Sequence, residues 1–351
     1  MRKQSWTAAA QRKWHAFTLV EMLISIVVLA LLILLATQVV NTTATVARPA
    51  NKHIDTDTEA RVVLDRMALD FGKMLKRTDV DYYIKAPTGY RNPKSHGKGK
   101  KLQTGQPGSD QIAVFSQVPG YYPSSGGVAS PISLVAYRVN SGSTTSASYL
   151  KLERMGKGLF WNGVTSPNNA PWPIVFTPLT IDATWPTATH NDSSANSQDS
   201  DYETIGPQVF RFEYYYLRKD GSIKDIPTLS SWDFAKSTSV NVNAFSDVEA
   251  IAVVIAVIDP ASRSLLYDPS TPTDPWHCLF SLGSDMADFK DANGIGIGAQ
   301  KVGDLENQWN TAVHDAATTG HTYDLSVFPP AAASAIRIYN RYLDLKTLSS
   351  L

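Results

Sequence analysis

The chain has 351 residues, with 32 basic and 32 acidic side chains and a single cysteine, Cys278. This balanced charge gives no basic footprint of the kind that binds nucleic acid, so we expect no nucleic-acid partner. One cysteine excludes an intramolecular disulfide, and the fold must therefore be held by its own apolar core.

A long apolar run lies near the start of the chain. It extends from Phe17 to Val40, and Glu21 is its only charged residue. About 20 apolar residues at roughly 1.5 Å each span a hydrocarbon core of about 30 Å, and lipid accepts such a segment only as a helix. The run is preceded by basic residues and no acid: Arg2, Lys3, Arg12 and Lys13. The positive-inside tendency therefore places the N-terminus in the cytoplasm and the residues after the run outside.

Two simpler interpretations of this run are an ordinary secretory signal and a plain membrane anchor. A signal peptide has an apolar region of about 7–15 residues, followed by a cleavage site with small residues. This run is longer, and residues 37–47 offer only the loose match Thr42-Thr43-Ala44. A plain anchor explains the length but not Glu21, because a carboxylate in lipid is costly.

The residues from Ala16 to Glu21, together with the basic leader and the apolar run, resemble the prepilin cleavage and methylation site of type IV pilins and type II secretion pseudopilins. The resemblance implies that residues 1–16 are a leader, which prepilin peptidase removes by cutting between Ala16 and Phe17. It also implies N-methylation of Phe17 and a role for Glu21 in assembly with other pilin or pseudopilin subunits. The family usually has Gly before the cut, so Ala16 departs from the pattern and slower processing is expected.

The same resemblance implies a physical reason for Glu21. A carboxylate in lipid favours a nearby cation. In the family, the N-terminal amine of an incoming subunit lies near the acid of its neighbour, and pairing neutralises both charges. The implied role of Glu21 is assembly register rather than catalysis. The alternative is that Glu21 lies at the level of the lipid headgroups, because it is only four positions from Phe17.

The membrane and assembly helix is taken as residues 17–40, and an amphipathic second half of the same helix is predicted over residues 41–77. Pro49 predicts a bend, because proline removes a donor and crowds the preceding turn. Apolar residues recur every three or four positions, with charged residues between them. The apolar positions are Ala60, Leu64, Met67, Phe71 and Leu75, and the charged positions are Arg61, Asp65, Arg66 and Asp70. The alternative is two separate helices joined by a linker.

Beyond residue 77 the apolar period changes to two, which predicts strands separated by turns rich in Gly, Ser and Pro. The predicted strands are residues 111–117, 132–139, 149–154, 209–217 and 248–258. The last is apolar almost throughout, as expected for a strand covered on both faces, and it is too short for a second membrane span. Asp220-Gly221 predicts a hairpin turn. Residues 78–351 are therefore predicted to form a β-rich extracytoplasmic head of a pilin-like α+β protein.

Two parts of the head carry narrower resemblances. The order of Leu152-Glu153-Arg154, the strand 209–217, Asp220-Gly221 and the strand 248–258 is similar to the J-type minor pseudopilin of type II secretion, where such strands close a second sheet. The segment from Ser334 to Leu345 and the loop around Trp276 resemble the pilin-like group Verru_Chthon cassette protein C. That C-terminal segment is either a strand or a short helix. Its inward-facing residues are expected to be Ile336, Ile338 and Tyr342.

No catalytic constellation is predicted, and we expect that the chain is not an enzyme. His277 and Cys278 are adjacent rather than spaced as metal ligands, and we expect them in a partly buried loop. A second histidine group could hold a metal only by folding together, because its spacing follows neither a helix nor a hairpin. That group comprises His314 and His321 with Asp315 and Asp324.

Structural calcium is the one cofactor for which the sequence offers a candidate site. Asp285, Asp288, Asp291 and Asn293 gather oxygen ligands beside Gly294, but their order differs from that of an EF-hand. The pseudopilin resemblance implies that calcium in an irregular loop is compatible with the family. The alternative is a capped helix that ends at a Gly-rich loop, with no metal ligand among these residues.

Taken together, these features favour a minor pilin or pseudopilin that is assembled into a type II secretion pseudopilus or a type IV pilus-like fibre. Such a subunit is a single-pass protein of the inner membrane, with its N-terminus in the cytoplasm and its head in the periplasm, and a secreted cargo is a further expected partner. The alternative is a membrane-anchored binding or adhesion protein that holds a polymer or cargo through exposed aromatic side chains. The candidates are Trp161, Trp172, Trp185 and Trp232, and burial in the core is the competing interpretation of each.

Overall fold

The structure is a computed structural model of the chain. It describes residues 18–75, 109–122, 128–158, 202–224, 248–289, 301–318, 322–323 and 326–345. The chain divides into two compact units, Met1–Asn51 and Lys52–Leu351, and helix α1 (Leu19–Gly72) contributes residues to both.

Helix α1 is one α-helix of 54 residues, so the alternative of two helices joined by a linker is wrong. The helix passes through Pro49 without a break. It ends at Gly72 rather than at residue 77, because the chain then pairs with the first sheet through an isolated antiparallel bridge between Met74 and Ser116. Next to this bridge, Leu75 N donates to the carbonyl of Phe115 at 2.8 Å. Backbone hydrogen bonds therefore tie the end of α1 to the edge of a sheet.

The first sheet has the strand order β1-β4-β5-β2-β3, and β6 also pairs with β5. Its strands are β1 (Ile112–Ser116), β2 (Gly120–Tyr122), β3 (Val128–Ser130), β4 (Ser133–Val139), β5 (Leu152–Gly158) and β6 (Tyr202–Gly206). The β1–β4 and β4–β5 pairs are antiparallel, with Val135 opposite both Val114 and Gly156. The strands predicted at 111–117 and 132–139 are confirmed.

The strand predicted at 149–154 begins three residues later than expected. Tyr149, Leu150 and Lys151 instead close the β4–β5 connection, where Leu150 N donates to the carbonyl of Asn140 at 2.7 Å. Leu150 has φ 51°, a left-handed conformation that a bulky residue keeps only when its surroundings impose it. Here its side chain is fully buried and its carbonyl accepts a hydrogen bond from Arg263 Nη2 at 3.1 Å. The alternating pattern alone could not reveal this irregularity.

The second sheet is antiparallel, with the order β12-β9-β7-β8. Its strands are β7 (Val209–Arg218), β8 (Ile223–Lys224), β9 (Val248–Val257) and β12 (Arg337–Asp344). The predicted turn after β7 is confirmed: Gly221 has φ 78°, and Ser222 N donates to the Asp220 carboxylate at 2.8 Å. Glycine at this position avoids the strain that other residues would meet at positive φ.

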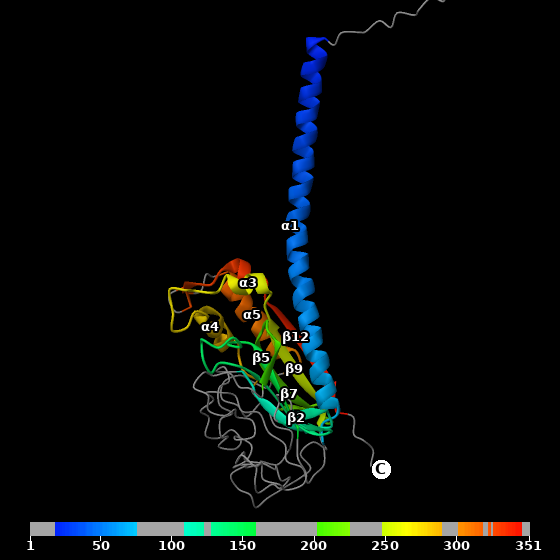
Figure 1. The fold of residues 1–351 in the computed structure, drawn as a ribbon, viewed down its shortest axis with the longest axis vertical. Coiled ribbons are helices and arrows are strands. Elements are labelled where there is room, and N and C mark those ends of the chain that lie inside the picture. Colours follow the sequence, from blue (N-terminus) through cyan, green and yellow to red (C-terminus); the bar gives the residue numbers. More distant parts are fainter. Residues whose placement is uncertain are drawn as a thin grey trace, which may run out of the picture. The chain divides into compact units, whose positions relative to one another are not determined.

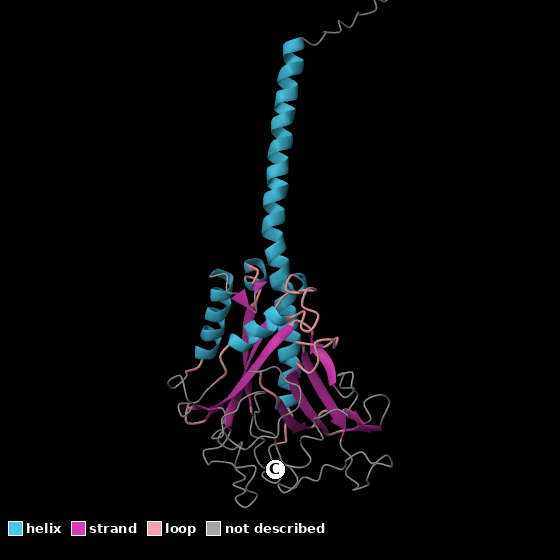
Figure 2. Ribbon diagram, turned by 90° about the vertical axis from the view of Figure 1, so that its left-hand side faces the viewer, coloured by secondary structure: helices cyan, strands magenta, loops and turns pink. Residues whose placement is uncertain are grey.

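Four short helices and a small hairpin complete the described part of the head. They are α3 (Pro260–Ser264), α4 (His277–Asp285), α5 (Asp304–Thr318), α6 (Pro330–Ala333), β10 (Thr322–Tyr323) and β11 (Ser326–Val327). Helices α4 and α5 lie on the side of the second sheet away from the Lys52–Gly72 part of α1 (Figure 1). Figure 2 shows the strands of both sheets next to the helices.

Strand β9 separates two hydrophobic cores, which explains why it is apolar at every position except Glu249. Its side chains alternate between them: Ile251, Val253 and Ile255 join the core that contains α1 and both sheets. Ala252 and Val254 join the core beneath α4 and α5. The prediction that this strand is covered on both faces is confirmed.

The C-terminal segment that the sequence left undecided forms α6 followed by strand β12. Ile336 is buried and Ile338 is partly buried, as predicted, but Tyr342 is 37% exposed and its predicted inward position is wrong. Helix α5 meets β12 at Asn340, whose Nδ2 donates to Glu306 at 2.8 Å. Tyr342 lies two residues further along the same face of this edge strand and is left exposed.

Candidate functional site

The first turn of α1 contains a capping box. The Thr18 backbone N–H and hydroxyl both donate to Glu21 Oε2 at 2.9 Å, while Glu21 N donates to Thr18 Oγ1 at 3.3 Å. Such a reciprocal arrangement satisfies backbone donors that a helix leaves open at its start. The sequence reasoning missed it, although Thr18 and Glu21 have the spacing of the motif. Ala16 and Phe17, the residues of the expected cleavage site, lie outside the described residues.

The first half of α1 is apolar and exposed. Among the described residues, the segment Leu19–Asn41 is the one stretch of helix long and apolar enough to cross a membrane. Two of its polar side chains are satisfied within the helix: Ser25 Oγ donates to the carbonyl of Glu21 and Thr37 Oγ1 to that of Ile33, each at 2.7 Å. Such internal bonds lower the cost of hydroxyl groups in an apolar solvent.

The second half of α1 is built into the core of the head. The predicted apolar ridge is confirmed at Ala60, Leu64, Met67 and Phe71, which are all buried. They pack with side chains from β1, β4, β7 and β9, so this half of the helix contacts both sheets. Stability of this half therefore comes from tertiary packing more than from helix propensity.

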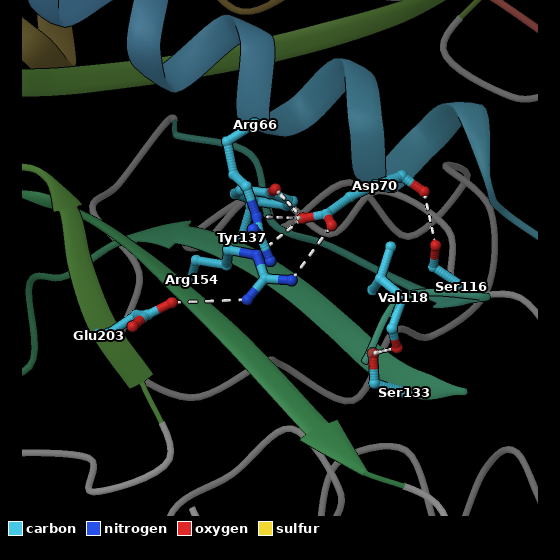
Figure 3. Close-up of polar contacts among 8 residues, drawn as sticks. All are labelled: Arg66, Asp70, Ser116, Val118, Ser133, Tyr137, Arg154 and Glu203. Carbon is cyan, nitrogen blue, oxygen red and sulfur yellow. Dashed lines mark hydrogen bonds and ion pairs between the residues drawn. The ribbon is translucent and has the colours of Figure 1, made fainter. Parts of the chain in front are cut away.

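A buried ionic cluster centred on Asp70 joins α1 to the first sheet (Figure 3). Arg154 of β5 binds the carboxylate through two nitrogens, Nε to Oδ2 at 2.7 Å and Nη2 to Oδ1 at 3.1 Å. The Tyr137 hydroxyl of β4 donates to the same Oδ2. Arg66 is one turn earlier on α1, and its Nε lies 3.5 Å from Asp70 Oδ2. Glu203 Oε1 lies 3.5 Å from Arg154 Nη1.

The electrostatics of this cluster favour the charged state of Arg154. Burial disfavours the charge of Arg154, but its hydrogen bonds with Asp70 and the charge of that carboxylate raise the pKa of the guanidinium overall. Burial, with the charge and hydrogen bond of Asp70, raises the pKa of Tyr137 well above its ordinary value. Both carboxylate oxygens of Asp70 accept hydrogen bonds, so the geometry fits a structural role of Asp70 better than the role of an acid or base that transfers a proton.

Other acidic side chains of α1 also bind the head. Glu59 Oε1 accepts from Gln208 N, in the turn between β6 and β7, at 2.6 Å. Asp57 accepts from the Tyr339 hydroxyl, and Asp65 pairs with Arg341, both partners being on β12. Together with Asp70, these contacts fasten one helix to both sheets. The sequence placed Asp65 and Asp70 alike between the apolar positions, but only Asp70 is buried.

The calcium candidate is divided by the limits of the described residues. Asp285 is the exposed last residue of α4, and Asp288 Oδ1 lies 2.6 Å from Nη2 of the buried Arg211. The guanidinium already neutralises this carboxylate. Asp291 and Asn293 lie outside the described residues, within which no group of three or more His, Cys, Asp and Glu side chains could hold a metal. The calcium site stays a prediction.

The histidine candidates do not form a cluster within the described residues. His277 and Cys278 begin α4 and are both buried, so their expected position in a loop is wrong. The reason is local: His277 N and Nδ1 both contact the carbonyl of Asp274, which starts the helical turn. His314 and Asp315 lie on α5, whereas His321 and Asp324 fall outside the described residues.

The aromatic candidates for polymer binding cannot be placed, because Trp161, Trp172, Trp185 and Trp232 all lie outside the described residues. Two other tryptophans are described. Trp309 is fully buried and donates to the carbonyl of Ala287 at 2.7 Å, while Trp276 is partly buried beside Tyr267.

No family model matches this chain, and no curated protein shows significant sequence similarity to it. The described residues establish an α+β protein with antiparallel sheets and one N-terminal helix that is long and apolar enough to cross a membrane.

Proposed function

We propose that the chain is a minor pilin-like or pseudopilin subunit, with a structural rather than a catalytic role. In this proposal it is held by α1 in the inner membrane with its head in the periplasm, and is assembled into a secretion pseudopilus or a pilus-like fibre with other such subunits. One observation carries the proposal: a single helix supplies both an exposed apolar segment of membrane length, Leu19–Asn41, and a buried ridge in the core of the head. A subunit that passes from lipid into a fibre needs both parts on one element.

The proposal gives Glu21 two successive roles. Before assembly its carboxylate completes the capping box with Thr18, as the geometry of the first turn supports. After prepilin peptidase cuts between Ala16 and Phe17, the new amine is that of Phe17, the residue next to Thr18. In the fibre, the negative charge of Glu21 then pairs with the methylated Phe17 amine of a neighbouring subunit, which neutralises both groups in an apolar surrounding.

Mass spectrometry of the N-terminus of the membrane-extracted protein tests the proposal directly. The expected mature chain begins at N-methylated Phe17. An intact Met1, or a cut after residue 36, would overturn the proposal.

Two substitutions of Glu21 separate its charge from its capping. Glutamine also serves at this position of a capping box, so Glu21→Gln keeps the hydrogen bonds and removes the charge, while Glu21→Val removes both. We expect normal cleavage of both variants and a similar loss of incorporation into fibres. Thr18→Ala is the matched control, because it weakens the cap and keeps the charge, and it should assemble normally. Full assembly of Glu21→Gln would show that capping alone explains the acid.

A further inference from the structure

An exposed and largely uncharged face lies on the head at α3 and α6, which contact each other. In Figure 1, α3 (yellow) lies beside the red-orange ribbon of α6. None of the exposed residues in the ranges 260–273 and 330–334 carries a charge, and they include Leu265 and Tyr267, which are 56% and 50% exposed. We call this surface the α3–α6 face.

The segments contain two charged side chains, Arg263 and Asp268, and each of them is hydrogen bonded. Arg263 is buried, donates to the carbonyls of Tyr149 and Leu150 at 3.1 Å, and lies 5.1 Å from the ring centre of Trp276. Asp268 accepts hydrogen bonds from Ser270 and Thr271. Apart from the partly exposed Asp268 carboxylate, the outward surface of the face is therefore apolar, hydroxyl and aromatic.

The aromatic residues at this face have the chemistry of a water–lipid boundary. The rings of Tyr267 and Trp276 meet edge to face, with centroids 5.3 Å apart. Tyrosine and tryptophan combine an apolar ring with one polar group, and they are enriched where a bilayer meets water. An exposed leucine beside them adds surface that gains free energy on leaving water.

The chain tethers this face close to a bilayer. Gln208 links α1 to the start of α3: its N donates to Glu59 Oε1 of α1 at 2.6 Å, and its carbonyl accepts from Ile258 N, two residues before α3, at 3.1 Å. The face therefore adjoins the part of the head where α1 enters it. Only residues 42–51 separate the apolar segment from the head unit, and ten residues reach at most about 36 Å even when fully extended. A tether this short keeps the effective concentration of the membrane at the α3–α6 face high, so a weak affinity of this face for lipid is enough to hold it at the bilayer.

We propose that, in the subunit before assembly, the α3–α6 face lies against the lipid headgroups. This inference rests on the proposed function in one respect, the insertion of Leu19–Asn41 into the membrane. Because no exposed cation lies on the face, the contact needs no anionic lipid and is insensitive to salt.

Depth-dependent fluorescence quenching tests this proposal on the full chain. The single cysteine is removed by Cys278→Ser, and Leu265→Cys receives an environment-sensitive NBD label. The protein is reconstituted into phosphatidylcholine vesicles, with or without lipids that carry a doxyl group near the headgroup. Val302→Cys is the matched control, because Val302 is 51% exposed and lies before α5, outside the residues that form the α3–α6 face. We expect doxyl lipid to remove most of the emission at position 265 and little at position 302, at low and high salt alike.

Two results would overturn the proposal. One is equal, weak quenching at positions 265 and 302 in vesicles where the chain resists alkaline extraction; this leaves the proposed function standing. The other is that position 265 shows no doxyl quenching and is protected from aqueous iodide only when the vesicles hold much protein. That result would assign the face to contact with a second copy of the chain. Release of the chain by alkaline extraction would instead contradict the proposed function itself.

A variant series checks that the exposed side chains make the contact. With the label moved to Ala261→Cys, the pair Leu265→Ser and Tyr267→Ser should abolish doxyl quenching, whereas Val302→Ser should leave it unchanged. All three positions are exposed, so the thermal unfolding of each variant should match that of its parent and exclude misfolding.

Discussion

Asp70 occupies a position of α1 where the helical period requires a buried side chain. It follows Met67 by three residues and precedes Phe71 and Met74, which all belong to the same core. An acid is stable there because Arg154 and Tyr137 meet it from the first sheet. From the sequence, Asp70 was placed with the charged residues between the apolar positions, because its partner Arg154 is 84 residues away and only the folded sheet brings the two together.

Substitution of Asp70 by Asn should destabilise the protein strongly. The change leaves the buried Arg154 guanidinium without its counter-charge, and breaking a buried ion pair on one side costs about 3–5 kcal/mol. Asp65→Asn is the matched control, because Asp65 and Arg341 form a largely exposed pair worth about 0.2–1 kcal/mol. Thermal unfolding of the full chain in detergent, followed by near-ultraviolet circular dichroism, measures both; equal losses would contradict the assignment of Asp70 as the fixed point of α1.

Glu59 should make stability depend on pH in the direction opposite to a paired acid. Burial raises the pKa of Glu59 above its ordinary value of 4.5, and the hydrogen bond from Gln208 with the charges of Arg263 and Lys151 only partly opposes the rise. The unfolded chain therefore releases this proton first, and the stability contributed by the carboxyl falls as pH rises from about 4.5 through the folded pKa. Glutamine at position 59 does not titrate. The melting temperature of Glu59→Gln relative to the parent should rise across this window, and a falling difference would contradict the prediction.

At the scale of elements, α1 combines two environments on one helix, and its exposed and buried positions can be separated by mutation. Met67 is fully buried in the core shared with both sheets, while Leu69 is exposed. Met67→Ala should lower the free energy of unfolding by about 2–5 kcal/mol through lost burial and a cavity. Leu69→Ala should change it by about 0.5 kcal/mol or less. Chemical denaturation of the two variants measures the difference, and similar values would show that α1 does not pack as described.

The long helix and the longer strands followed from periodicity and turn residues, and the failures among these predictions have local causes. Strands β4, β7 and β9 begin within one residue of their predicted starts, because each alternates or runs apolar between clear turn signals. Strand β5 starts later than predicted because Leu150 adopts a left-handed conformation, held by Arg263 from a segment more than 100 residues away. The capping box is readable from spacing alone, because Thr18 and Glu21 are three residues apart at the start of the apolar run.

For the whole molecule, the proposed topology predicts which part of the chain a protease can reach. The basic leader precedes the apolar segment, so the head should lie on the periplasmic side. In cells without prepilin peptidase, where residues 1–16 stay on the chain, protease added to spheroplasts should digest the head and spare an epitope placed before residue 17, while lysed cells should lose both. Protection of the head in intact spheroplasts would contradict the proposed orientation.

Strand β9 limits how the length of this protein can vary. Successive side chains of the strand enter different cores, the larger Ile251, Val253 and Ile255 on one face and the smaller Ala252 and Ala256 on the other. Inserting one residue within Val248–Val257 would exchange the two sets, so that isoleucines meet space shaped for alanines. Insertions and deletions in natural variants of this chain should therefore fall outside β9, in the connections on either side of it.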